Sequence, residues 1–216
     1  MLDIRFMKRN VFILVFILVF MMVGLLAYSQ TCDEAIDKML NKLNTTSLQT
    51  DFNISITEPE TQSLNYSGQL LTLGSKFNLR MLTIQAFFDG STLWVYDKDI
   101  DEINITHPTD QELIESNPLL LIRLVRYNCR LHFTDNFRDP AQWSVDLYPN
   151  DKKSSVLKYT VQFRRSDLMP MRITISETLN RTTTIILSGQ KYDVDTTGKF
   201  NLDTNKYRDA VVNDLR

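Results

Sequence analysis

Residues 76–106 read KFNLRMLTIQAFFDGSTLWVYDKDIDEINIT, and this stretch decides the fold. Alternation of apolar and polar side chains predicts a strand with one apolar face and one polar face. The segments that alternate in this way are 76–82, 84–89, 92–96 and 102–106. Asp89-Gly90 has the composition of a tight hairpin turn, and residues 98–101 form a second polar turn. The stretch therefore predicts an antiparallel meander of four short strands.

The same pattern continues on both sides of the meander. Before it, residues 48–57 and 64–73 alternate, with Pro59 and then Gly74-Ser75 at their ends. After it, the alternating segments are 131–137, 142–148, 156–163, 171–176 and 182–187. Short strands at regular spacing are typical of an antiparallel sheet that curls into a barrel or a half-barrel. From Gly189 onward the chain is polar and predicts no further element.

Helical patterns appear at only three places. Residues 33–43 carry Ile36, Met39, Leu40 and Leu43 at helical spacing, which predicts a short amphipathic helix. Between Pro108 and Arg126 the strand pattern stops. A helix start is expected at residues 109–112, and Asn117-Pro118 begins a second helix, 118–126, with proline in its first turn.

The helix 118–126 is apolar over most of its circumference, so another part of the molecule has to cover it. The fold class predicted from these patterns is mainly β with short helices (α+β). In this fold a curled antiparallel sheet forms an unclosed β-barrel with a helical lid.

The N-terminus has the pattern of a secretory signal. Arg5, Lys8 and Arg9 precede the apolar run 11–26, and Ala27 and Ser29 stand at positions −3 and −1 of a cut between Ser29 and Gln30. We therefore predict a signal peptide at residues 1–29, followed by a single domain at 30–216. Met7 would also make a typical signal start, so the choice between Met1 and Met7 stays open.

Two other interpretations of the N-terminus stay open. One is an uncleaved anchor, although the apolar run is shorter than the roughly 20 residues that span a bilayer. The other is acylation of Cys32, although Ser29-Gln30-Thr31 does not have the large aliphatic residue expected three positions before a lipid-modified cysteine.

The charge excludes one class of partner. The full chain has 24 basic and 26 acidic residues, a net charge of −2, and loss of three basic residues and one acidic residue with the signal leaves −4. Nucleic-acid binding depends on many Lys and Arg contacts to phosphate. A mildly acidic chain without basic clusters therefore does not predict a nucleic-acid partner.

Cys32 and Cys129 are the two cysteines, and both lie in the predicted mature chain. In an oxidising compartment they are candidates for a disulfide, and the alternative is two unrelated thiols. The sequence leaves both open because it contains no information on the distance between them.

The chain carries no motif for catalysis or for a metal. A Cys129–His132 nucleophile pair would need a third orienting group. Asp97, Asp99 and Asp101 have the spacing of calcium-loop ligands, but the loop's glycine and its final glutamate are missing. We predict neither an enzyme nor a metal site.

Three motifs, in order, resemble the Lol family of outer-membrane lipoprotein carriers (LolA-like). They are Phe77-Asn78-Leu79, the hairpin DGSTLWVYD at 89–97 with its return at Glu102-Ile103, and the helix start Asn117-Pro118-Leu119-Leu120-Leu121. Each motif alone is weak. Their order and spacing match the family along essentially the whole mature chain.

The resemblance implies a periplasmic chaperone with an unclosed barrel, a helical lid, no cofactor and no catalysis. Such a protein accepts triacylated lipoproteins from an inner-membrane lipoprotein-releasing ABC transporter and passes them to an outer-membrane acceptor; we expect it to be a monomer. Carriage of this kind is physically required, because each CH2 group left in water costs roughly 0.8 kcal/mol. Two alternatives of the same fold are a lipoprotein-sensing module and an outer-membrane acceptor anchored through an acylated Cys32.

One departure from the family concerns its lid. Family members carry an arginine, usually followed by proline, about four residues before the phenylalanine of the strand motif, and it helps to lock the lid. Here Leu73 and Gly74 stand at those positions before Phe77. This departure puts the lid-locking mechanism, and handover from the usual transporter, in question.

The candidate acyl-chain cavity consists of the apolar strand positions and the apolar lid positions. They are Phe52, Ile54, Ile56, Leu70, Phe77, Leu79, Met81, Ile84, Phe88, Leu93, Leu120, Leu121 and Leu124. Ordinary core packing explains the same alternation, and alternation alone does not say which face is concave. Trp94 and Tyr96 fall on the opposite face, where they brace the sheet or meet a partner.

Overall fold

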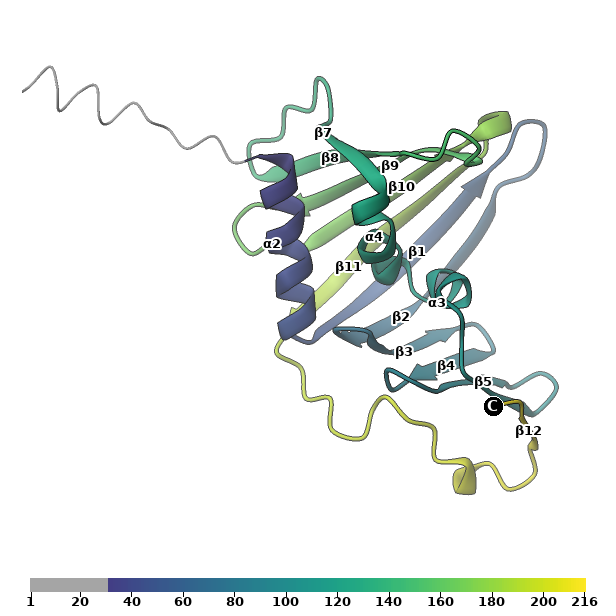
Figure 1. Ribbon diagram of the computed structural model, residues 1–216. Helices are drawn as coiled ribbons and strands as arrows, with labels where there is room; N and C mark the ends of the chain where they lie inside the picture. The colour runs from purple at the N-terminus through teal and green to yellow at the C-terminus, as the bar shows by residue number, and fades with distance from the viewer. Residues whose placement is uncertain (1–30) are drawn as a thin grey trace, which may run out of the picture. The chain divides into compact units, whose positions relative to one another are not determined.

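Twelve strands form one sheet in the computed structural model, which describes residues 31–216 (Figure 1). The strands are β1 (Leu48–Thr57), β2 (Leu64–Leu73), β3 (Lys76–Met81), β4 (Ile84–Phe88), β5 (Leu93–Asp97), β6 (Glu102–Thr106), β7 (Cys129–Phe133), β8 (Gln142–Pro149), β9 (Val156–Arg164), β10 (Pro170–Glu177), β11 (Thr182–Tyr192) and β12 (Val211–Asp214). The predicted signal peptide and its cleavage site lie outside the described residues. Residues 32–216 form one compact unit.

The strand order is β12-β6-β5-β4-β3-β2-β1-β11-β10-β9-β8-β7. Neighbours are antiparallel except β12 and β6, which run parallel. Within the described residues β12 and β7 are the two edges of the sheet. The structure confirms the predicted fold class, a large unclosed sheet with a few short helices.

The helices begin and end where their capping residues allow. They are α2 (Cys32–Thr45), α3 (Asp110–Ser116) and α4 (Pro118–Val125), with short 3-10 turns at η1 (Arg126–Asn128), η2 (Thr178–Asn180) and η3 (Thr204–Lys206). Thr109 and Glu112 form a capping box at the start of α3. Asn117 then ends α3 and caps α4, in which Pro118 occupies the first turn. In residues 31–216, no helix is both long and apolar enough to cross a bilayer.

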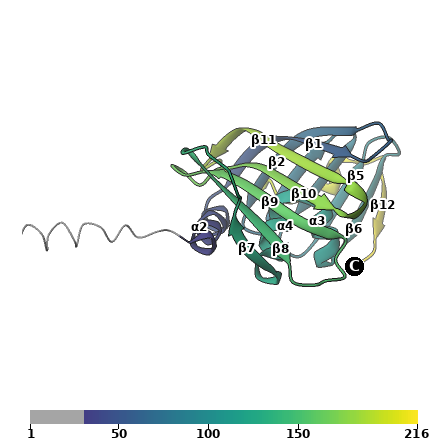
Figure 2. The ribbon, with the colours of Figure 1, turned by 90° about the horizontal axis from the view of Figure 1, so that it is seen from above.

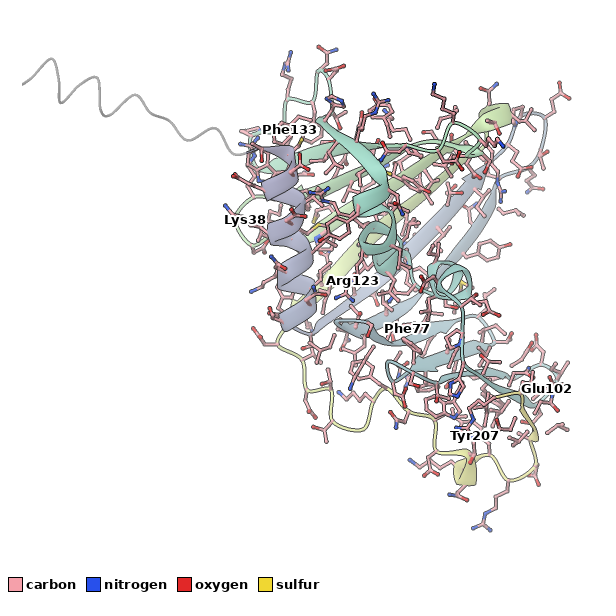
Figure 3. The ribbon with its side chains drawn as sticks, viewed as in Figure 1. Lys38, Phe77, Glu102, Arg123, Phe133 and Tyr207 are labelled. Carbon is pink, nitrogen blue, oxygen red and sulfur yellow. The ribbon has the colours of Figure 1, made fainter. Side chains whose placement is uncertain are left out.

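The sheet is curved, and the helices lie inside its curve. Seen from above, the strands curl round α3 and α4, while α2 lies along one end of the sheet (Figures 1 and 2). We call the helix-covered side the concave face and the other side the convex face. α2 turns Ala35, Ile36, Met39, Leu40 and Leu43 toward the sheet. Lys38 points away from it (Figure 3).

Strand β11 is longer than the predicted segment 182–187, because it continues through Gly189 to Tyr192. Gly189 has φ +61°, a left-handed conformation that glycine adopts at little cost, and the pairing with β1 shifts register opposite it, between Gln49 and Asp51. A Cβ at this position would lie 2.7 Å from a carboxylate oxygen of Asp51. Glycine therefore makes a bulge here and does not end the strand.

The C-terminal segment 193–216 is structured, contrary to the expectation of a polar tail without elements. It crosses the convex face below β3 to β6 and ends in β12, which pairs with β6 (Figure 1). Leu202 joins Phe87, Ile103 and Ile105 in a small buried cluster. Val211 donates its N–H to the carbonyl of Asp101 at 2.9 Å. A four-residue strand was missed because its pairing partner is more than a hundred residues away.

A candidate binding face beneath the helices

All ten predicted strand positions lie on the concave face. Residues opposite one another across a strand pair share a face, and the register links Leu70 to Leu79, Phe77 to Phe88 and Phe88 to Leu93. The same rule links Met81 to Ile84, and it puts Phe52 beside Gly68, two residues from Leu70. Figure 3 shows Phe77 in the sheet beneath the helices. This shared face is the concave one, because its residues pack in one cluster with residues of α2 and α4.

Nine of the thirteen candidate residues meet in one apolar cluster beneath the helices. They are Phe52, Ile54, Leu70, Phe77, Leu79, Met81, Phe88, Leu93 and Leu120, with Ile54 and Met81 only partly buried. Ile56, Ile84, Leu121 and Leu124 lie outside this cluster. Of these four, Leu121 is buried and the other three are half-buried. The candidate set therefore contains a packed centre and a looser margin.

The second half of the sheet contributes as much of this face as the first half. Its buried members are Val145, Leu147, Val161, Phe163, Ile173, Ile185 and Leu187. Sequence reasoning did not include these residues in the site, although they alternate in segments that were predicted as strands. The signal that could have found them is the antiparallel topology, which continues the apolar face of β1 directly onto β11.

The concave face opens at a pocket of about 580 Å³ between the helices and the rim of the sheet. Its less polar lining comes from the helices and the rim and its polar lining from the rim and the start of α3. The first group is Ile114, Leu124, Val125, Cys129, Pro149 and Tyr159, and the second is Asp110, Asn128, Asn150, Asp151, Ser154 and Ser155. Small-molecule sites in proteins commonly measure about 300–1,000 Å³. Burial raises the pKa of Tyr159, whose phenol lies at the margin of the pocket.

Arg126 ties the end of α4 to α2. Its guanidinium is nearly buried and donates to the carboxylates of Asp33 at 2.8 Å and Asp37 at 2.8 and 3.1 Å. Burial opposes the charge on Arg126, but the hydrogen bonds and charges of Asp37 and Asp33 outweigh it, and the pKa of Arg126 is raised. Sequence reasoning missed this tie because its partners are about ninety residues apart.

The position that carries an arginine in the family is structurally different here. Leu73 ends β2 opposite Lys76, and Gly74 makes the turn with φ +60°. No guanidinium reaches the helices from this turn. The charged contact between α4 and α2 described above is made by Arg126 and not by a residue of this turn.

Both cysteines are free thiols in the structure. Burial and the neighbouring Asp33 raise the pKa of Cys32, and burial raises that of Cys129 although Arg126 partly offsets it. Raised pKa values make both thiols poor nucleophiles. Cys129 and His132 lie on opposite faces of β7, because they are three positions apart in a strand whose side chains alternate. The strand therefore does not assemble a cysteine–histidine pair.

The predicted acidic turn and the two outward aromatics also have structural explanations. An oxygen of Asp97 accepts the Asp99 N–H at 2.9 Å, and Asp101 accepts the Tyr96 hydroxyl at 2.9 Å. Tyr96 packs on Tyr207 of the C-terminal segment, with ring centroids 4.5 Å apart, and Trp94 joins the same cluster. Trp94 and Tyr96 therefore brace the convex face. In the described part of the chain, no group of His, Cys, Asp and Glu side chains is arranged to hold a metal ion.

Comparison with known proteins agrees with this architecture. The sequence model of the family described as "Outer membrane lipoprotein carrier protein LolA" matches residues 43–203. No curated protein sequence matches this chain. An uncharacterized conserved protein from Thermus thermophilus has a similar fold, with a TM-score of 0.52 and 13% identity over 84% of this chain and 97% of that one.

Two further structures bear related names. A LolA superfamily protein from Nitrosomonas europaea gives a TM-score of 0.43 and 12% identity over 79% of this chain and 98% of its own. A domain from Vibrio parahaemolyticus, described as a "putative outer membrane lipoprotein-sorting protein domain", gives a TM-score of 0.38 and 10% identity. The match covers 80% of this chain and 94% of that one.

Proposed function

The chain belongs to the LolA family of outer membrane lipoprotein carriers, and from this premise we propose that it is a periplasmic carrier of lipid-modified proteins. It binds the acyl chains of its cargo on the concave face, beneath α3 and α4. It takes the cargo from an inner-membrane transporter and delivers it to an outer-membrane acceptor.

The observation that carries the proposal is the continuity of the concave face with its opening. The apolar face extends from β5 through β1 to β8, and Val125, Cys129 and Tyr159 belong both to its cluster and to the lining of the 580 Å³ pocket. The space directly under the helices is filled by fully buried side chains such as Phe52, Phe77 and Leu70. Acyl chains that enter at the pocket must therefore displace α4 from the sheet.

Displacement of α4 costs little if the ligand replaces the contacts that the helix loses. Leu119 and Leu120 pack against the concave cluster. Burying apolar area stabilises by roughly 25 cal/mol per Å², whether the apolar partner is a helix or an acyl chain. The exchange makes binding reversible, which a carrier requires.

The test is release of newly made lipoproteins from spheroplasts or from inner-membrane vesicles supplied with ATP. We expect the mature protein to carry lipoproteins into the soluble fraction. Leu79→Asp, which puts a charge beneath the helices, and Leu121→Asp, which puts a charge at a buried position of α4, should abolish release. Ile186→Asp is the matched control, because Ile186 lies on the opposite face from its neighbour Ile185 and is 40% exposed. Absence of release by the native protein, with no lipid bound to it, would contradict the carrier function.

A further inference from the structure

Asn117 has an unused hydrogen-bond donor inside the lid. The residue joins α3 to α4 and is 0% exposed. Its Oδ1 accepts the N–H of Leu119 at 2.9 Å, and its backbone N–H donates to the carbonyl of Leu113 at 3.0 Å. Its side-chain nitrogen, Nδ2, is the one buried side-chain nitrogen or oxygen in the described residues that has no partner.

The cap does not require this nitrogen. Asp and Ser cap helices about as well as Asn, and each does so through an oxygen. A buried donor without a partner carries a desolvation penalty of about 1–3 kcal/mol. The amide of Asn117 therefore destabilises the structure described here, and the cap alone does not explain its presence.

Neighbours of Asn117 in α3 and α4 pack in the apolar cluster beneath the helices. Leu113 packs against the concave cluster, and Leu119 and Leu120, which follow Asn117 in α4, belong to it. A hydrocarbon chain would offer no acceptor at such a position. Each acyl chain of a lipoprotein, however, is attached to the cargo through a carbonyl group. The carbonyl belongs to an ester on glycerol or to an amide on the terminal amino group of the lipid-modified cysteine.

We propose that Asn117 is a binding residue for acylated cargo, and that its Nδ2 donates a hydrogen bond to an acyl carbonyl when the cargo lies under the lid. This inference rests on the proposed carrier function. It adds that the site recognises the linkage of the acyl chains as well as their apolar length, and that the lid helices make this contact.

The test compares two synthetic lipopeptides that differ only in the linkage. Both carry two saturated sixteen-carbon chains on an S-glyceryl cysteine peptide, one through esters and the other through ethers without carbonyl oxygens. A net hydrogen bond contributes about 0.5–1.5 kcal/mol, and 1.4 kcal/mol is tenfold in affinity. We expect the native protein to bind the ester lipopeptide about 5-fold more tightly than the ether lipopeptide.

Asn117→Ser and Asn117→Asp keep a capping oxygen and remove the amide nitrogen. In both variants the ratio of affinities should fall to one or below, because a carbonyl buried without a donor is penalised. Asn41→Ser is the matched control, since it removes an exposed amide from α2, and it should keep the native ratio. Thermal unfolding of each variant identifies any loss of fold, and the ratio within one protein does not depend on the amount of folded material.

The outcomes separate the two proposals. Equal affinity of the native protein for both lipopeptides overturns the role of Asn117 and leaves the carrier function in place. A preference for the ester that persists in both Asn117 variants assigns the recognition to another group and also overturns it. Failure of the native protein to bind either lipopeptide contradicts the proposed function itself.

Discussion

Two helices cover the same concave face, yet α2 and α4 differ in what their outer sides carry. α2 is amphipathic: its inner stripe is buried, Lys38 lies on its exposed side, and Asp33 and Asp37 accept hydrogen bonds from Arg126. α4 buries Pro118 to Ile122 and still has Leu124 and Val125 half-buried beside the pocket. Arg126 joins the two helices.

This difference indicates different roles. In a helix with one apolar stripe and one charged side, the sheet covers the apolar stripe and water solvates the charged side. A helix that is apolar on both sides has an additional surface to cover, and the pocket lies against it. We therefore expect α2 to be a fixed wall whose variants change stability. We expect α4 to be the mobile cover, whose variants change cargo binding.

The largest expected effect is on α2. Met39 is 0% exposed, and Met39→Ala should lower the free energy of unfolding by about 2–5 kcal/mol, because a cavity is left in a packed core. Urea unfolding measures this loss. The affinity of the folded variant for a diacyl lipopeptide should stay native. A small loss of stability together with weakened binding would mean that α2, too, is part of the mobile cover.

The junction between the helices is expected to give the next largest effect. Arg126→Ala removes three charged hydrogen bonds from a nearly buried guanidinium. We expect a loss of about 2 kcal/mol, since hydrogen bonds to charged groups contribute about 1.5–3 kcal/mol but Asp33 and Asp37 become solvated. A double-mutant cycle with Asp37→Asn isolates the pair, and Arg126→Lys keeps the charge without the bidentate geometry. Additive effects in the cycle would show that α2 and α4 are energetically independent.

A smaller effect on stability is expected in α4. Leu124→Ala removes a half-buried side chain at the pocket, so the free energy of unfolding should fall by less than about 1 kcal/mol. The affinity for the lipopeptide should fall about 5-fold, because the same side chain contacts the entering acyl chain. Ile100→Ala, at an exposed hairpin turn, is the control and should change neither quantity. Native affinity of the Leu124 variant would count against α4 as the cover.

The sequence was sufficient for the local part of this fold. Alternation located β1, β2 and β6 to the residue and the other predicted strands within a few residues, because a half-buried strand shows its period directly. Asn117-Pro118 located the start of α4 for a similar reason, since a proline in the first turn and a capping side chain are local requirements.

Contacts between segments far apart in the chain could not be predicted from these local patterns. The tie from Arg126 to Asp33 and Asp37, the pairing of β12 with β6 and the continuation of the face onto β11 each join segments far apart in the chain. The orphan donor of Asn117 is also invisible in a sequence, because it depends on which acceptors lie nearby. Single-chain patterns report neighbours along the chain, and a binding face is made by neighbours in space.

The last expected effect is a difference in titration between the two helices. Tyr192 lies beside α2, with the Lys42 Nζ 4.9 Å from its ring centroid, and burial followed by the charge of Asp167 raises its pKa to about 12. The unfolded chain ionises this phenol near pH 10, so between about pH 10 and 12 the folded protein holds the extra proton. The stability that Tyr192 contributes is fully present below about pH 10 and is lost as the pH rises toward 12. Tyr192→Phe should remove this part of the pH dependence of urea unfolding.

The same titration in the presence of bound lipopeptide distinguishes the roles of the two helices. If α2 is a fixed wall, the pKa of Tyr192 should be the same with and without bound lipopeptide. Tyr159 borders the pocket beside α4, and its pKa is raised by burial first and by Cys129 next. A lipopeptide that enters there should bury this phenol further and raise its pKa again. Ultraviolet difference titration of Tyr192→Phe and Tyr159→Phe against the native protein separates the two phenols. A shift confined to Tyr192 would reverse the roles of the two helices.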